Sequence, residues 1–245
     1  MKISIELIPR QKEQLLSEGV EISERFRNIS VVNIPDLLKL NLRSWEACGM
    51  LKEHFSEAIP HIRAMDFNTK DIGKLLDLLE QSNVSEILVL TGDKPQDLRK
   101  VYSTNSLDLI RKIKSIRDIK IYAAIDQYRG NIKKELEYIQ RKLDAGADGF
   151  FTQPFFDIRF LQMYMDFLQD YEVYWGISPI LSENAVNYWE IKNDVVFPKD
   201  FEFSLEWNID YAQKVLRLVR QIDSNLYFMP VRTDINEYLS RVFEC

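Results

Sequence analysis

The sequence predicts a single (β/α)8 barrel, in which eight parallel strands form a closed barrel inside a ring of helices. Three observations favour this fold class: eight short apolar runs rich in β-branched residues, stretches of helical period between them, and a length of 245 residues, which is a usual size for such a barrel. A doubly wound open sheet would normally need fewer strands. Proline and glycine number eight each and are scattered rather than pooled, so we expect one domain over residues 1–245.

The expected strands are near-continuously apolar, which is typical of parallel strands that are buried on both faces. In chain order they cover residues 3–8, 29–32, 59–64, 87–90, 119–125, 149–152, 173–177 and 226–230.

The clearest expected helix follows Asn131, where Ile132, Leu136, Ile139 and Leu143 are spaced by four, three and four residues and so share one face. A similar period predicts helices over 71–79, 106–116 and 211–222. Residues 191–203 have no clean period, and we expect an ordered excursion between two helices there. Strand and helix therefore alternate along the chain.

The composition excludes several classes of protein. With 46% hydrophobic and 29% charged residues, the chain is neither disordered nor collagen-like. Lys and Arg number 32 against 38 Asp and Glu, without a long run of like charge, so the stripe of positive charge that nucleic acid binding requires is missing. We expect no nucleic acid partner.

The residues that most often bind metals are scarce. Cys48, Cys245, His54 and His61 are the only cysteines and histidines, and they cannot build a disulfide framework or a Cys/His zinc site. The longest apolar runs are five or six residues, well short of the roughly 20 that span a bilayer. The N-terminus lacks the layout of a signal peptide. We therefore expect no metal, no membrane and a cytoplasmic location.

Active sites of this fold lie at the carboxyl ends of the strands, and the sequence has no GxGxxG, P-loop, GxSxG or HExxH pattern. Glu6 lies in the first apolar run, where an ionisable group is costly unless it is paired or used; its alternative role is a structural pair with a buried Lys or Arg. His61 either satisfies a backbone carbonyl or contacts a ligand. The turn Thr91-Gly92-Asp93 is weak evidence alone, since Gly-Asp is common in turns.

The stretch 144–157 is more informative. In this stretch we expect a turn of small residues at the end of a helix, then a buried strand, with Gln153 at the end of that strand. A Gln side chain offers a donor and an acceptor together, which suits the amide-like edge of a heterocycle. The following pair, Phe155 and Phe156, is more often core than a cofactor contact. Arg141 and Lys142 lie near the end of the preceding helix, either as favourable charges there or as contacts for a ligand phosphate.

These motifs, in order, resemble the methylenetetrahydrofolate reductase family, flavin-containing barrels that reduce methylenetetrahydrofolate to methyltetrahydrofolate. The matching segments are Ile5-Glu6-Leu7-Ile8-Pro9, Pro60-His61-Ile62, 87–95, 144–157, Trp175-Gly176-Ile177-Ser178-Pro179-Ile180 and 207–243. The segment 144–157 is similar to the family's Asp-Ala-Gly-Ala…Thr-Gln signature and is the most specific of them.

The resemblance implies a role for each candidate. Glu6 would be the acid that assists iminium formation at the folate, Asp93 would lie near flavin and pterin, and Gln153 would bond the pterin. Phe203, with Phe201, would cover the folate. FAD would be reduced by NAD(P)H, and its site would be lined by His61, Leu90, Gly92, Asp93, Tyr102, Ala123, Arg141 and Lys142, the last two on its phosphates.

The chain also departs from the family pattern. Thr91 stands where the family usually has Arg, Ile125 replaces an aromatic, the loop 126–131 lacks the family's His, and 33–36 with Arg43-Ser44 replaces the usual second-strand turn. Two alternatives to the flavin enzyme therefore stay open: a flavin-free barrel that binds folate or handles methyl-folate for a partner, and a catalytically silent binding module. A homo-oligomer is also compatible with the sequence.

Overall fold

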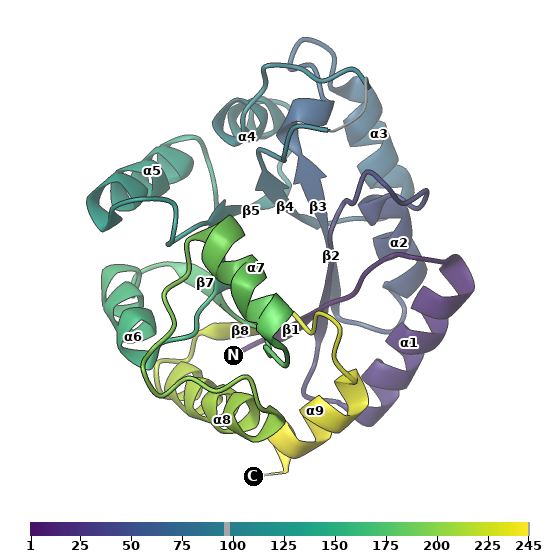
Figure 1. Cartoon of the computed structure of the whole chain (residues 1–245). Helices are drawn as coiled ribbons and strands as arrows, with labels where there is room; N and C mark the ends of the chain where they lie inside the picture. Colours follow the sequence, from purple (N-terminus) through teal and green to yellow (C-terminus); the bar gives the residue numbers. More distant parts are fainter. Residues whose placement is uncertain (96–98, 245) are drawn as a thin grey trace.

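The computed structural model describes residues 1–95 and 99–244, and its fold is the (β/α)8 barrel expected from the sequence (Figure 1). The strands are parallel and pair in chain order, and β8 closes on β1. They are β1 (Ile3–Glu6), β2 (Val31–Ile34), β3 (Glu57–Arg63), β4 (Glu86–Leu90), β5 (Lys120–Ile125), β6 (Gly149–Pro154), β7 (Glu172–Ile177) and β8 (Asn225–Phe228). Cys245 lies outside the described residues.

Each expected strand overlaps an observed one, but β2 lies two residues further along the chain than expected. The backbone N–H of Ile29 bonds Phe26 and that of Ser30 bonds Ile3 at the entrance to the strand. The strand then continues through Asn33, where the apolar run stops. A polar residue ends an apolar pattern, yet Asn33 is fully buried because its side chain has partners inside the barrel.

Helices connect the strands and form the outer ring. They are α1 (Lys12–Arg25), α2 (Ser44–Leu51), the 3-10 turn η1 (Ala64–Asp66), α3 (Gly73–Gln81), α4 (Ser106–Lys114), α5 (Ile132–Asp144), α6 (Ile158–Phe167), α7 (Glu183–Asn193), α8 (Leu205–Gln221) and α9 (Ile235–Phe243). The helix expected over 211–222 begins earlier, at Leu205, because the Ser204 side chain caps it by accepting the Trp207 N–H. The excursion expected over 191–203 is shorter, since residues 191–193 end α7.

The apolar packing inside the barrel comes from side chains of seven strands, β2 to β8. The rings of Phe151 and Tyr174 stack with centroids 4.3 Å apart, and Tyr122 meets Phe151 edge-on at 5.2 Å. The full set is Val31, Ile59, Leu88, Tyr122, Phe151, Tyr174 and Tyr227. A second, larger core lies between the strands and the outer helices. The interior is therefore closed below the strand ends, as expected for an eight-stranded barrel.

Helix α7 lies across the opening of the barrel rather than in the outer ring (Figure 1). Its Trp189 packs with Phe156 after β6 and Ile180 after β7, and Met229 after β8 contacts the same cluster. Because each of these residues follows the carboxyl end of a strand, α7 covers the mouth over β6 to β8. The strand ends on the other side of the mouth stay uncovered by it.

Replacing Gly149 should test how tightly the interior is packed. A Cβ at Gly149 would lie 2.6 Å from the Glu172 carbonyl oxygen and 3.0 Å from the Tyr122 ring, so Gly149→Ala should destabilise the protein by about 1–3 kcal/mol. Gly73→Ala is the control, because nothing lies within 4 Å of a Cβ there. Urea unfolding measures both, and equal stability of the two variants would contradict a tightly packed interior.

Candidate active site

Three polar side chains meet where β1, β2 and β3 end. The Asn33 side-chain amide lies 3.2 Å from Glu6 Oε2 and 3.1 Å from His61 Nε2. Glu6 Oε2 and His61 Nε2 are themselves 3.9 Å apart, too far for a direct hydrogen bond. Ser4 Oγ lies 2.8 Å from Asn33 Oδ1. The site is thus a buried network in which an amide bridges a carboxyl group and an imidazole.

Burial sets the protonation of this network. Desolvation raises the pKa of Glu6 to about 7, although the Asn33 hydrogen bond favours the charged carboxylate and opposes the shift. Desolvation lowers the pKa of His61 to about 3. Near neutral pH the site therefore holds a neutral imidazole and a carboxyl group that both gains and loses its proton readily, which is the property that a general acid needs.

A cleft of about 500 Å³ opens beside the network. Its walls come from the residues that follow β2 and β4 and from the ends of β3, β5 and β6. At the end of β4 the backbone turns at Gly92, whose φ is +90° and whose Cβ, if present, would lie 3.1 Å from Arg63 Cζ. Only glycine fits this turn against the guanidinium.

Arg63 anchors the β3 side of the cleft. Its guanidinium donates to the Asp93 carbonyl oxygen at 2.6 Å and lies 3.4 Å from Asp66 Oδ2. Arg43 holds Asp36 through its Nε at 2.9 Å and approaches the same Asp66 carboxylate at 3.4 Å. The two arginines and two aspartates thus form one ion-pair network that fixes the loops after β2, β3 and β4.

The far end of the cleft holds a buried ion pair on α5. Lys142 Nζ donates to the Ala124 carbonyl oxygen at 2.7 Å and to Glu135 Oε1 at 3.3 Å, and lies 4.0 Å from the Tyr138 ring centroid. Desolvation lowers the pKa of Lys142 to about 8, and the Glu135 charge opposes this shift. The buried face of α5 therefore includes two charged side chains beside Ile139.

Most of the candidate residues come together at this cleft. Glu6 adjoins it through Asn33 and His61. The candidates that line it are His61, Leu90, Gly92, Asp93, Lys142 and Gln153.

Two of the expected flavin contacts have side chains elsewhere. Ala123 is fully buried and packs in the helix-facing core, and Ala124 lines the cleft in its place, because adjacent residues of a strand face opposite sides. Arg141 is exposed on α5, with its guanidinium 5.5 Å from the Tyr138 ring centroid. Lys142 is thus the one of the two basic residues that faces the cleft.

Tyr102 and Phe203 also lie outside the cleft lining. Tyr102 is half-buried, and its backbone N–H bonds the Met65 carbonyl oxygen. Phe203 is 52% exposed, whereas Phe201 stacks on Phe197 with ring centroids 4.2 Å apart. The Phe203 side chain is therefore largely exposed and does not line the cleft.

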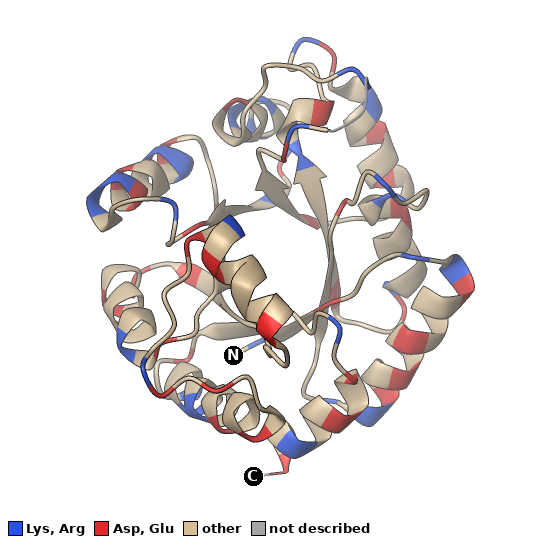
Figure 2. Ribbon diagram, viewed as in Figure 1, with Lys and Arg blue, Asp and Glu red and all other residues tan. Residues whose placement is uncertain are grey.

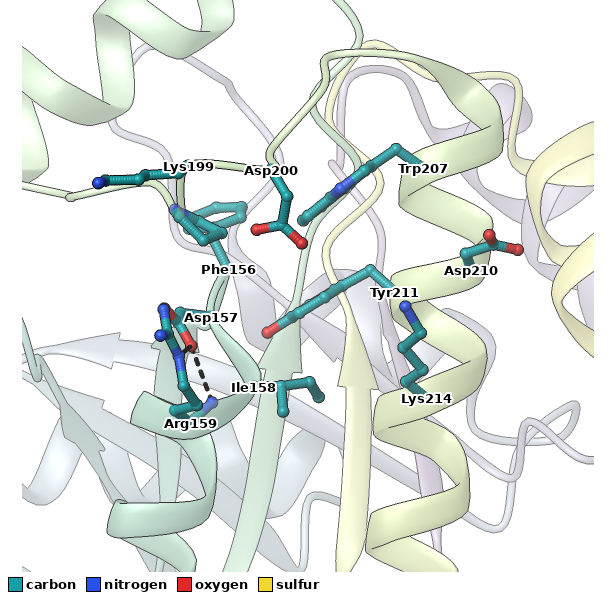
Figure 3. A pocket seen from close by; sticks show the side chains of 11 residues that line it. Phe156, Asp157, Ile158, Arg159, Lys199, Asp200, Trp207, Asp210, Tyr211 and Lys214 are labelled. Atoms are coloured by element: carbon teal, nitrogen blue, oxygen red, sulfur yellow. Dashed lines mark hydrogen bonds and ion pairs between the residues drawn. The ribbon is translucent and has the colours of Figure 1, made fainter.

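A second cavity, of about 660 Å³, lies between the starts of α6 and α8 (Figure 3). Trp207 and Tyr211 stack along one side of it with centroids 5.2 Å apart, and Asp157 binds Arg159 on the other. The Tyr211 hydroxyl points across the cavity and has no hydrogen-bond partner among the described residues. The two cavities share no lining residue, so this one is separate from the cleft.

Several residues of the site were not among the candidates from the sequence. Three of them are Asn33, Arg63 and Glu135, and Asn33 was noted only within the departure at 33–36. The periods of the strand and the helix could have indicated two of these residues, Arg63 and Glu135. Arg63 is two residues after His61 and so shares its face of β3, and Glu135 precedes Lys142 by seven residues, two turns of one helix face. Nothing in the apolar pattern marks Asn33, because its role comes from strands that are distant in sequence.

Charge on the outer helices is mixed, as Figure 2 shows. Exposed pairs such as Arg117 with Glu80 at 2.8 Å and Lys133 with Glu137 at 4.0 Å hold opposite charges close together. Such exposed pairs contribute little to stability. In the part of the chain that the structure describes, no helix is both long and apolar enough to cross a membrane.

Fold and site together define a class of protein: a (β/α)8 barrel with a buried acid and a polar cleft at its mouth. A family model described as methylenetetrahydrofolate reductase matches residues 3–217. The chain therefore belongs to the methylenetetrahydrofolate reductase family.

Individual relatives are distant. The chain is 27% identical to 5,10-methylenetetrahydrofolate reductase of Pectobacterium carotovorum, over 58% of this chain and 50% of that protein. It is 26% identical to the Buchnera aphidicola (subsp. Schizaphis graminum) protein of the same description, over 73% and 62%, and 24% identical to methylenetetrahydrofolate reductase 2 of Saccharomyces cerevisiae, over 86% and 39%. The chain thus spans about half the length of these relatives.

Solved structures support the fold alone. A crystal structure of 2,3-dimethylmalate lyase superposes with a TM-score of 0.60 at 11% identity, covering 98% of this chain and 77% of that one. A truncated 3-deoxy-D-arabino-heptulosonate 7-phosphate synthase from Thermotoga maritima gives a TM-score of 0.53 at 10% identity, covering 94% and 74%.

The cleft has features that fit a flavin nucleotide. Leu90 and Ala124 contribute apolar surface beside polar Gln153, and the close turn at Gly92 leaves backbone rather than a side chain at the wall. Lys142 and Arg129 line the cleft as well, and cations of this kind suit phosphate groups.

The acid at the mouth should make stability depend on pH. The pKa of Glu6 rises from 4.5 to about 7 on folding, so between these values the folded protein keeps a proton that the unfolded chain releases. The free energy of unfolding should therefore fall as pH rises through this range. Glu6→Gln should remove this fall. Above pH ~7 its free energy of unfolding should exceed that of the wild type by up to about 3 kcal/mol, at about 1.4 kcal/mol per pKa unit. Urea unfolding at several pH values measures this, and an identical pH dependence in both proteins would refute the raised pKa.

Proposed function

We propose that this protein is a flavin-dependent reductase of 5,10-methylenetetrahydrofolate that forms 5-methyltetrahydrofolate with NAD(P)H as the electron source. Family membership over residues 3–217 supports the reaction class. The observation that carries the proposal is the Glu6 carboxyl group, which is buried at the mouth beside the cleft and has a pKa of about 7. An oxidoreductase that protonates its substrate needs such a group.

Glu6 acts as the general acid in this proposal. Opening the methylene bridge of the folate to an electrophilic iminium requires proton assistance at a bridge nitrogen, and a carboxyl group with a pKa near 7 is protonated often enough to supply it. The neutral His61 lies beside Glu6 at 3.9 Å and is a poor proton source, because its pKa is lowered to about 3.

In this proposal the remaining residues of the cleft bind and orient the folate and FAD. Gln153 offers both a donor and an acceptor to the pterin edge. Asp93, held by Arg63 through its own carbonyl oxygen, also lines the cleft. FAD, when bound, supplies the hydride carrier. His61, Leu90 and Gly92 would line its ring, while Lys142 would face its phosphates. Helix α7 excludes water from the covered half of the mouth.

One observation favours a second candidate, a flavin-free barrel that binds folate. The cations of the cleft are already engaged: Arg63 with Asp66, Arg129 with Asp126 and Lys142 with Glu135. A diphosphate would have to compete with these carboxylates. A visible spectrum of the purified protein separates the candidates, since a flavin band supports the reductase and a colourless protein that binds folate supports the alternative.

Lys142 should contribute to FAD binding if the phosphates of FAD lie at the α5 end of the cleft. Replacing Lys142 alone would leave Glu135 as an uncompensated buried charge, so we compare Glu135→Gln/Lys142→Met with Glu135→Gln. The double variant should bind FAD about 10- to 100-fold more weakly, since a charge-assisted hydrogen bond contributes about 1.5–3 kcal/mol.

Arg141→Met is the matched control, because Arg141 is exposed and outside the cleft; its FAD affinity should equal that of the wild type. Flavin fluorescence titration measures all four proteins. Equal affinity of the double variant and Glu135→Gln would place the phosphates elsewhere.

The two half-reactions should respond differently to Glu6→Gln. Reduction of the enzyme by NAD(P)H needs orientation but no proton from a carboxylic acid, so its rate should stay nearly unchanged. Reoxidation by methylenetetrahydrofolate should slow by ~10²-fold or more, the range usual for loss of a general acid. Stopped-flow absorbance measures each step. Equal slowing of both would indicate a structural role for Glu6, and no slowing of either would remove it from the mechanism.

A further inference from the structure

We propose that Asn33 is a positioning residue that directs the acidic proton of Glu6 to its free oxygen and holds His61 in the tautomer protonated at Nδ1. The mechanistic part of this inference rests on the proposed function, in which Glu6 is the acid. The tautomer and the carboxyl protonation can be measured without any activity.

Asn33 is the buried side chain that links Glu6 to His61 inside the barrel. Asn33 and Ser4 are fully buried, and His61 is 8% exposed. The three strands that carry the network are neighbours, and Glu6 pairs directly with Asn33 in the register of β1 and β2. A buried amide is costly unless its hydrogen bonds are made; here the oxygen faces Ser4 Oγ at 2.8 Å and the nitrogen faces Glu6 and His61.

The amide orientation follows from what its neighbours can do. The Asn33 amide nitrogen lies 3.2 Å from Glu6 Oε2 and donates to it, an arrangement that suits the ionised carboxylate, which only accepts hydrogen bonds. The Asn33 side-chain oxygen then accepts a hydrogen bond from the Ser4 hydroxyl group. The second N–H of Asn33 points at His61 Nε2, 3.1 Å away, which must therefore present a lone pair. The imidazole proton is thus on Nδ1.

The same contact decides where Glu6 carries its proton. Oε2 is occupied by the Asn33 N–H in both protonation states, so the proton of the neutral acid resides on Oε1. Asparagine is suited to this position because one side chain gives two donors and one acceptor. A hydroxyl has a single donor, and an ionised aspartate has none.

Few other groups influence Glu6. His61 faces it from β3, and the Tyr227 hydroxyl on β8 senses its charge. Tyr227 donates to the Thr152 carbonyl oxygen at 2.6 Å, and its pKa lies well above its usual value through burial. Neither His61 nor Tyr227 ionises near neutral pH, so Asn33 is the neighbour whose replacement should change the titration of Glu6.

Nitrogen-15 NMR of histidine tests the tautomer directly. The chain has two histidines, and His54 is exposed, so His54→Gln leaves the signals of His61 alone. We expect a proton on Nδ1, none on Nε2, and no titration between about pH 5 and about pH 8. A proton on Nε2, or a titration near the ordinary histidine pKa of ~6.5, would overturn the proposal.

Asn33→Asp, made in the Glu6→Gln background so that no second carboxyl group shares its proton, should reverse the pattern, because an ionised carboxylate facing Nε2 accepts a hydrogen bond. In this variant we expect the His61 proton on Nε2. Asn225→Asp is the control: Asn225 is also a buried asparagine, but it begins β8 at the other end of the barrel, where it bonds Lys2 and Glu172. It should leave the His61 signals unchanged. Retention of the Nδ1 tautomer in Asn33→Asp would show that Asn33 does not set it.

Asn33→Leu tests the effect on Glu6. The Asn33 hydrogen bond favours the carboxylate, so its loss should raise the pKa of Glu6 above the wild-type value. Carbon-13 NMR of the Glu6 carboxyl group, assigned with Glu6→Gln, measures this titration. An unchanged titration would overturn the positioning role.

Kinetics separate this proposal from the proposed function. Asn33→Leu should slow reoxidation by methylenetetrahydrofolate at least ~10-fold and leave reduction by NAD(P)H unchanged. If Glu6→Gln itself has no effect on reoxidation, the proposed function fails, while the NMR results still decide the role of Asn33. If Glu6→Gln slows reoxidation and Asn33→Leu does not, the positioning role fails alone.

Discussion

The aromatic packing inside the barrel confines the polar chemistry of this protein to the two ends of the strands. Phe151 and Tyr174 stack on each other, and Tyr122 closes on both. A carboxyl group above this layer loses water on its inner side. Desolvation, rather than repulsion from another acid, is the cause of the raised pKa of Glu6.

Glu6 lies in different surroundings from the carboxylates at the amino end of the barrel. At the amino end, Glu86 and Glu172 accept from the Tyr122 hydroxyl and lie 3.6 and 2.8 Å from Lys120 Nζ, so a cation stabilises their charge. At the mouth, Glu6 faces an amide instead. An amide orients a carboxyl group without fixing its charge, and this is the condition under which a proton can be exchanged near neutral pH. The amino end therefore stabilises the fold, and the mouth retains reactivity.

The position of α7 divides the mouth into a covered half and an open half. Trp189, Phe156 and Ile180 pack together over the ends of β6 and β7, and the cleft opens on the other side, with His61 and Lys142 in its walls. The network of Glu6, Asn33 and His61 lies in the open half, where a ligand has access to the cleft.

The sequence by itself determined the barrel and most of the cleft. Eight apolar runs and the helical stretches between them specify the fold. Strands that are buried on both faces give continuous apolar runs, whereas helices that are buried on one face give an apolar residue every three or four positions. Ordered motifs marked His61 and Gln153 at the strand ends. The tertiary structure decided the rest: Ala124 rather than Ala123 faces the cleft, Lys142 rather than Arg141 is buried, and Asn33 joins two strands. Strand register and the rotation of α5 about its axis decide which of these side chains face the cleft. Neither can be predicted from the local periodicity of the sequence.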